Sequence, residues 1–149
     1  MPLRRALPWF VLLLCALSLP ARAGDCQVRI EGGWVRKPPA DLPMLAGYAR
    51  IANPCEHSVE IVSASSGDFA DVSLHATLVE DGISRMRAVD SLPVAAGETV
   101  ELAPGGKHLM LMRPQRKLRD GDTVVISFRL ADGGELRGTF EVKGPKALP

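Results

Sequence analysis

From residue 24 onward, the sequence alternates between short β-rich runs and turns that contain glycine. No stretch of this part keeps the 3.6-residue apolar period of an amphipathic helix. The turns include Asp81-Gly82 and Pro104-Gly105-Gly106, where glycine supplies the positive φ that tight turns need. The pattern therefore predicts an all-β chain. The expected strands span residues 27–35, 46–52, 59–65, 72–79, 83–89, 99–102, 108–112, 123–130 and 136–142.

About nine strands at this spacing favour a single Greek-key barrel or sandwich. The one long irregular stretch, residues 36–45, contains three prolines and is interpreted as a surface loop, because no second core follows it. An apolar fraction of 46% and a charged fraction of 23% are ordinary for a globular protein. We expect one β domain over residues 24–149, and we expect it to be a monomer.

The first 23 residues have the three parts of a secretory signal peptide. Arg4 and Arg5 precede a short apolar core, and residues 21–23 read Ala-Arg-Ala, a small-x-small cleavage site. The core is too short to span a bilayer, so we expect cleavage before Gly24 and a periplasmic protein without stable membrane insertion. An uncleaved N-terminal anchor is the alternative. The residue before Cys15 is not the small one of a lipoprotein signal, so no lipid anchor is expected.

Cleavage would leave two cysteines, Cys26 and Cys55. In an oxidising exported compartment, two remaining cysteines most simply form a disulfide. The rival interpretation is a pair of free thiols that bind a metal.

Charge and motifs exclude several classes of function. The net charge is +1 and aromatic residues make up 5% of the chain, which argues against a nucleic-acid binder. No nucleophile-elbow pattern or catalytic spacing is present, so an enzyme is not expected.

Two pairs of histidine and methionine fall on expected strands. His108 and Met110 alternate with leucines and therefore point to one face. With a two-residue turn at Asp81-Gly82, His75 would pair with Ala88, and Met86 would lie diagonal to His75 on the same face. A three-residue loop there would place His75 and Met86 on opposite faces.

Imidazole and thioether ligands together suit a soft ion, above all Cu(I), whereas Zn(II) rarely takes methionine. Thioethers also remain available in an oxidising compartment, where thiolates are lost to disulfides. Taken singly, a strand methionine is usually core filler and a strand histidine is usually a surface residue.

Spacing makes the metal interpretation more specific. Ten residues separate His75 from Met86, 21 separate Met86 from His108, and one separates His108 from Met110. This arrangement resembles the motif of the periplasmic copper chaperone family known as PCuAC. The surrounding sequence is similar too, including Ala-Gly-Tyr at residues 46–48 and Pro-Gly-Gly before the His108 strand.

The resemblance implies a cupredoxin-like Greek-key barrel that binds Cu(I) at an exposed site formed by His75, Met86, His108 and Met110. It also implies delivery of copper toward the copper centre of cytochrome c oxidase, with an oxidase subunit or a Sco-type thiol chaperone as partner. Many relatives have a methionine directly after the first histidine, and this chain does not.

Met44 and Met112 are candidate additional metal ligands. We place Met44 in the proline-rich loop, where it could close over the metal, and interpret Met112 mainly as packing. The last residues, 143–149, contain neither methionine nor histidine, so no second copper site is expected there.

Two other functions compete with the copper chaperone. A blue-copper electron carrier on the same fold would need a cysteine thiolate beside two histidines, and no cysteine is near His75 or His108 in the sequence. A metal-free assembly domain of immunoglobulin-like type is the other alternative.

Overall fold

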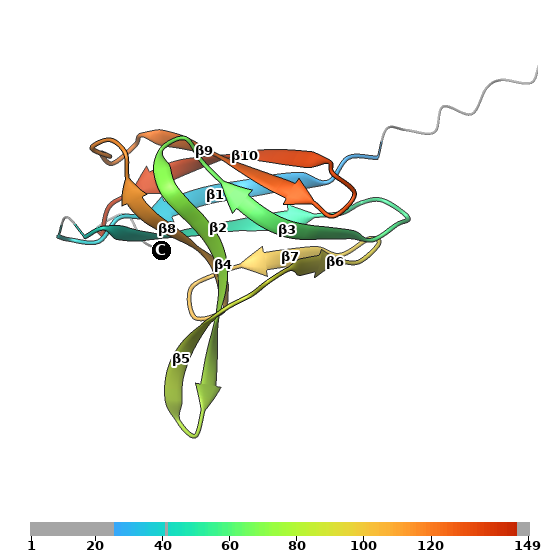
Figure 1. The fold of residues 1–149 in the computed structure, drawn as a ribbon, viewed down its shortest axis with the longest axis horizontal. Coiled ribbons are helices and arrows are strands. Elements are labelled where there is room, and N and C mark those ends of the chain that lie inside the picture. Colours follow the sequence, from blue (N-terminus) through green and yellow to red (C-terminus); the bar gives the residue numbers. More distant parts are fainter. Residues whose placement is uncertain (1–25, 41, 146–149) are drawn as a thin grey trace, which may run out of the picture.

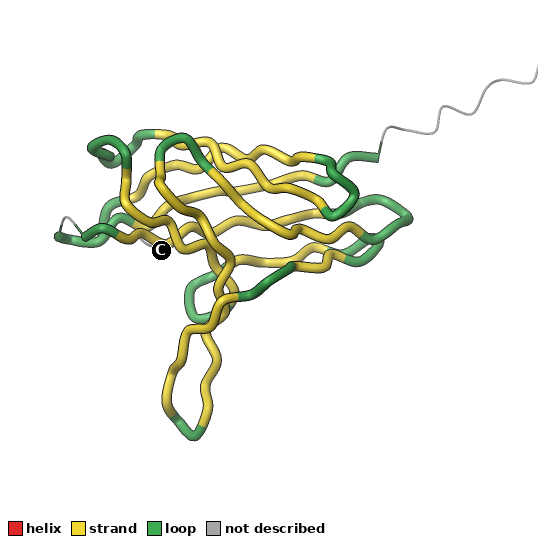
Figure 2. Tube along the Cα trace, viewed as in Figure 1, coloured by secondary structure: helices red, strands yellow, loops and turns green. Residues whose placement is uncertain are grey.

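The protein is described here from a computed structural model that places residues 26–40 and 42–145. The predicted signal peptide lies outside these residues. All regular elements among them are strands (Figure 2), which confirms the all-β prediction. None of the described segments forms an apolar helix long enough to cross a membrane. The strands are β1 (Arg29–Arg36), β2 (Met44–Ala52), β3 (Val59–Ser65), β4 (Phe69–Glu80), β5 (Ile83–Ala88), β6 (Leu92–Val94), β7 (Thr99–Leu102), β8 (Lys107–Pro114), β9 (Thr123–Leu130) and β10 (Glu135–Lys143).

The strands close into a barrel in the order β4, β8, β2, β1, β10, β9 and β3, with β3 pairing back to β4. The β1–β10 pair is parallel, whereas the other pairs are antiparallel. β5, β6 and β7 extend the wall as partners of β4, β3 and β2. Closure leaves few free edges, and it turns one face of each strand inward.

Strand alternation builds the core. Along β9, Val124, Ile126 and Phe128 are buried while Val125 between them is half exposed. Phe140 on β10 packs beside Phe128, with ring centroids 6.4 Å apart. The inward residues of the other strands complete one continuous apolar cluster.

The β4–β5 hairpin leaves the barrel and projects as an arm (Figure 1). Its turn contains Asp81 and Gly82 at φ values of 52° and 75°, the positive pair that a two-residue hairpin turn needs. The resulting register pairs His75 with Ala88 and Thr77 with Met86. The predicted two-residue turn and its register are therefore correct.

Several strand boundaries differ from the prediction, and one strand was not expected. The largest shift is in β4, which begins at Phe69 and not at residue 72. β6 was not expected, because it has three residues and contains Pro93, a residue that weakens a strand signal. β2 begins at Met44, so the predicted loop over residues 36–45 is too long at both ends and covers only residues 37–43. Pairing with β8 extends β2, and that partner is not visible from local sequence.

Candidate metal site

The candidate ligands lie on the outer face of the barrel wall, where β4, β8 and β2 pair. His75 on β4 stands directly opposite His108 on β8, and Ser73 stands opposite Met110. Leu109 alternates with these residues and is fully buried in the core. Alternation therefore turns both histidines and Met110 to the same outer face.

His108 is held in one orientation by its surroundings. It is 4% exposed although it lies on the outer face. Its Nδ1 lies 3.0 Å from the carbonyl oxygen of Gly106. Because a carbonyl can only accept, Nδ1 carries the proton in the neutral imidazole, which leaves the Nε2 lone pair for a metal.

His75 has an imidazole with unused bonding capacity. Its ring is stacked on that of His108, with centroids 6.1 Å apart and an interplanar angle of 24°. Its Nδ1 is buried and has no hydrogen-bond partner. An unpaired buried nitrogen is costly, so this ring suits a metal ligand that gains its partner when the ion binds.

Met86 reaches the same face from the arm. It pairs with Thr77, two positions along β4 from His75, and is 53% exposed. Met86, His108 and Met110 line one open depression of about 400 Å³. His75 is not among its lining residues and stands beside His108 on the next strand. The structure thus brings three of the four predicted ligands to one depression and places the fourth next to them.

Of the two additional candidates, Met44 lies closer to the depression. Met44 is the first residue of β2, opposite Met112 on β8, so its predicted position in a loop is wrong. It lines the depression and is 44% exposed. Met112 shares the outer face with Met110 but does not line the depression.

Tyr48, which packs on Trp34, forms an aromatic wall beside His108 that was not predicted. Tyr48 lines the depression, with its ring centroid 6.4 Å from that of His108 and 4.5 Å from that of Trp34. The sequence does contain a signal for the outer position of Tyr48, because it alternates with the inward residues Ala49 and Ile51 of β2.

The side chains that line the depression offer uncharged metal-ligand atoms. Among the described residues that line it, Arg36 is the only charged one. Thioether sulfur and imidazole nitrogen bring no ligand charge, which matches a soft monovalent ion better than a hard divalent one.

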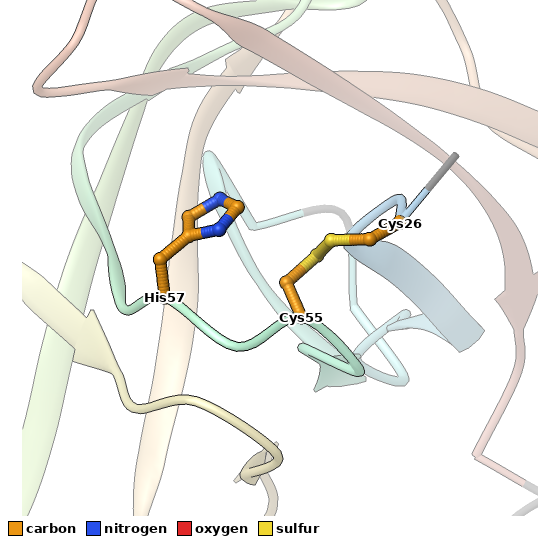
Figure 3. A group of neighbouring side chains, drawn as sticks. All are labelled: Cys26, Cys55 and His57. Atoms are coloured by element: carbon orange, nitrogen blue, oxygen red, sulfur yellow. A yellow bond between two sulfur atoms is a disulfide. The ribbon is translucent and has the colours of Figure 1, made fainter. Parts of the chain in front are cut away.

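The two cysteines of the described part of the chain lie elsewhere. Cys26 and Cys55 are joined in a disulfide with a Cα–Cα distance of 5.3 Å (Figure 3). Cys55 follows the end of β2 opposite Met44. Neither cysteine lines the depression, so neither can supply a thiolate beside His108.

The chain is similar in sequence to known proteins over most of its described residues. A family model described as "Putative lipoprotein LpqE-like" matches residues 28–142. "Putative lipoprotein Lxx21020" from Leifsonia xyli subsp. xyli is 31% identical over 125 residues, 80% of this chain and 74% of the relative. "Uncharacterized protein RP573" from Rickettsia prowazekii is 31% identical over 88 residues, 58% of this chain and 49% of the relative.

Solved structures of copper proteins share the fold. The solution structure of Cu(I)-bound DR1885 from Deinococcus radiodurans has a TM-score of 0.66 at 28% identity, covering 82% of this chain and 83% of that one. The copper-bound PCuAC domain from PmoF2 has a TM-score of 0.65 at 21% identity, covering 79% of this chain and 93% of that domain. These likenesses confirm the predicted cupredoxin-like barrel.

Proposed function

We propose that this chain, which belongs to the LpqE-like family, is an exported copper chaperone. Its Cu(I) ligands are His75, Met86, His108 and Met110. The observation that carries the proposal is the register of β4 with β5 and with β8. That register sets His75 opposite His108 and Met86 diagonal to His75 on one outer face. Copper in the similar structures of DR1885 and PmoF2 supports the choice of metal.

The donor set supports Cu(I) rather than a catalytic metal. A catalytic Zn(II) or Mg(II) site uses carboxylate, water and imidazole ligands. Here, the described residues of the depression contribute thioether sulfur and imidazole instead. Binding and release, rather than catalysis, is the function these ligands serve.

The position of the site favours transfer. The depression is open and Met86 is more than half exposed, so an acceptor can approach the ion directly. Neutral ligands leave Cu(I) exchangeable for the thiolates of a partner. We assign the acceptor role to a Sco-type thiol chaperone or a cytochrome c oxidase subunit, and the place of transfer to the periplasm. The lipoprotein names of the relatives support export to the cell envelope.

Competition with a Cu(I) chelator tests the assignment. We expect Met86→Leu and Met110→Leu to keep the fold and to weaken Cu(I) binding at least tenfold, because leucine preserves volume but removes the sulfur. Met112→Leu is the matched control, since Met112 lies on the same face of β8 outside the depression. X-ray absorption of the Cu(I)-loaded protein should count both sulfur and nitrogen neighbours. Parental binding in both ligand variants would show that the assigned site is wrong.

The two alternative functions give different outcomes in the same experiments. An intense blue Cu(II) form would indicate an electron carrier. Failure of the parent to retain Cu(I) against a modest chelator would indicate a metal-free assembly domain.

A further inference from the structure

A second group of potential ligands surrounds the disulfide, at the end of β2 away from the depression. Cys26, Cys55 and His57 each place one ligand atom within 4.8 Å of the other two. Figure 3 shows the His57 imidazole, on the same loop as Cys55, beside the disulfide that joins this loop to Cys26. We propose that reduction of this disulfide creates a site for one thiophilic metal ion, with two thiolates and the His57 imidazole as ligands.

Ligand geometry favours such a site. Around a tetrahedral Zn(II), with Zn–S near 2.3 Å and Zn–N near 2.0 Å, neighbouring ligand atoms lie about 3.5–3.8 Å apart. The present atoms lie within 4.8 Å of one another, so side-chain rotation brings them to these separations once the S–S bond is broken. Three protein ligands leave a fourth position for water.

The loop keeps its shape through contacts that do not involve sulfur. Asn53 is 1% exposed, and its Oδ1 accepts the Cys55 N–H at 3.1 Å. Its Nδ2 donates to the His57 carbonyl at 2.9 Å and to the carbonyl of Ala95 at 3.0 Å. The Gly97 N–H donates to the Cys55 carbonyl at 3.1 Å. Cys55 and His57 therefore stay in place when the disulfide opens, so two of the three ligands are preorganised.

The difference in exposure between Cys26 and Cys55 determines which sulfur atom a reductant attacks first. Cys26 is exposed, whereas Cys55 is buried. A thiolate of an external dithiol attacks the Cys26 sulfur, the S–S bond breaks, and Cys55 leaves as a thiolate that takes up a proton. The second thiol of the reductant then displaces Cys26, so the dithiol becomes a disulfide and both cysteines are reduced. The metal ion replaces the two thiol protons when it binds.

This site is independent of the proposed copper site. The depression contains no thiol among its described residues, so its ligand set is the same in the oxidised and reduced protein. The oxidation state of one disulfide would thus determine whether the protein has one metal site or two.

Zn(II) is the selective probe, because it prefers thiolate and imidazole to thioether. The full chain is compared in oxidised form and after reduction by a dithiol that is removed under anaerobic conditions. We expect the reduced protein to bind one additional equivalent of Zn(II) against a chromophoric chelator, and to gain thermal stability from it. His57→Gln should weaken this binding at least tenfold and Cys55→Ser should abolish it. Arg129→Gln is the control and should leave it unchanged, because Arg129 is exposed on β9 and belongs to neither proposed metal site.

Three results would overturn the proposal. The first is that the reduced parent binds no more Zn(II) than the oxidised parent. The second is that His57→Gln binds Zn(II) as tightly as the parent. The third is that reduction abolishes the β-sheet circular dichroism, which would show that the loop is not preorganised. Cu(I) titration of the oxidised protein is a separate measurement. Failure of the Zn(II) proposal would therefore leave the copper assignment standing, and failure of the copper assignment would leave the Zn(II) proposal standing.

Discussion

The Cys26–Cys55 disulfide gives a stability prediction with a magnitude that follows from chain length. The perturbation is the double variant Cys26→Ala and Cys55→Ala, with dithiol reduction of the parent as a second route to the same open chain. The bridged residues are 29 apart in sequence. In the chain-entropy model, closing a loop of this length in the unfolded state stabilises the fold by about 3.6 kcal/mol at 25 °C.

The predicted loss can be converted into a melting temperature. The barrel has roughly 120 described residues, and at about 2.1 cal/mol/K per residue its unfolding entropy is about 250 cal/mol/K. A loss of about 3.6 kcal/mol then lowers the melting temperature by roughly 14 °C. Since domains of this kind are stable by about 5–15 kcal/mol, we expect the open form to remain folded at 25 °C.

Urea unfolding monitored by circular dichroism measures the free energy directly. Free-thiol titration of unfolded, unreduced parent must first find no thiol, and two thiols would refute the pairing itself. Cu(I) affinity should stay unchanged in the double variant, because neither cysteine lines the depression. A loss below about 1 kcal/mol by both routes would refute the chain-entropy reasoning for this loop.

Three further perturbations test other parts of the description. Cu(I) binding should weaken as the pH falls, by up to about a hundredfold per pH unit, because protonation of the two proposed imidazole ligands competes with the metal. Unchanged Cu(I) retention at about pH 4 in chelator competition would contradict histidine ligation. The backbone N–H of Arg119 lowers the pKa of Asp122, so the stabilising effect of this carboxylate is present at neutral pH and is lost as the pH falls through that lowered value. Urea unfolding of Asp122→Asn should therefore show a larger deficit at pH 7 than at pH 2.5, and equal deficits would contradict it. Gly82 has a φ of +75°, so Gly82→Ala should lower the free energy of unfolding by about 1–2 kcal/mol and weaken Cu(I) binding by loosening the arm. Gly67 also lies in open space but has no positive φ, so Gly67→Ala should change neither quantity.

Local signals predicted the parts of the fold that depend on neighbours in sequence. The sequence favoured a two-residue turn at Asp81-Gly82 over a three-residue loop, and the positive φ of both residues and the pairing of Thr77 with Met86 confirm that choice. The start of β2 at Met44 did not follow, because it depends on pairing with Met112 on a strand far along the chain. Contacts between distant strands are set by barrel closure, which no local pattern encodes.

The same distinction holds for the candidate site. Residue types and alternation predicted which side chains share a face within each hairpin or strand. The stacking of His75 on His108 arises from β4–β8 pairing, which no turn connects directly. The unpaired Nδ1 of His75 depends on the same pairing, so sequence reasoning alone could not place it, whereas the outward face of Tyr48 follows from alternation along β2.

The arm shows how one hairpin can be both held together and open to a ligand. On the face opposite Met86, Glu80 accepts from Arg87 at 3.0 Å and lies 3.7 Å from Arg85. Such exposed ion pairs contribute at most about 1 kcal/mol each, but they gather the charges of the arm on one side. The other side carries Met86 and the exposed Val79, both uncharged. Strict alternation over the hairpin therefore keeps charged groups away from the thioether that the copper site requires.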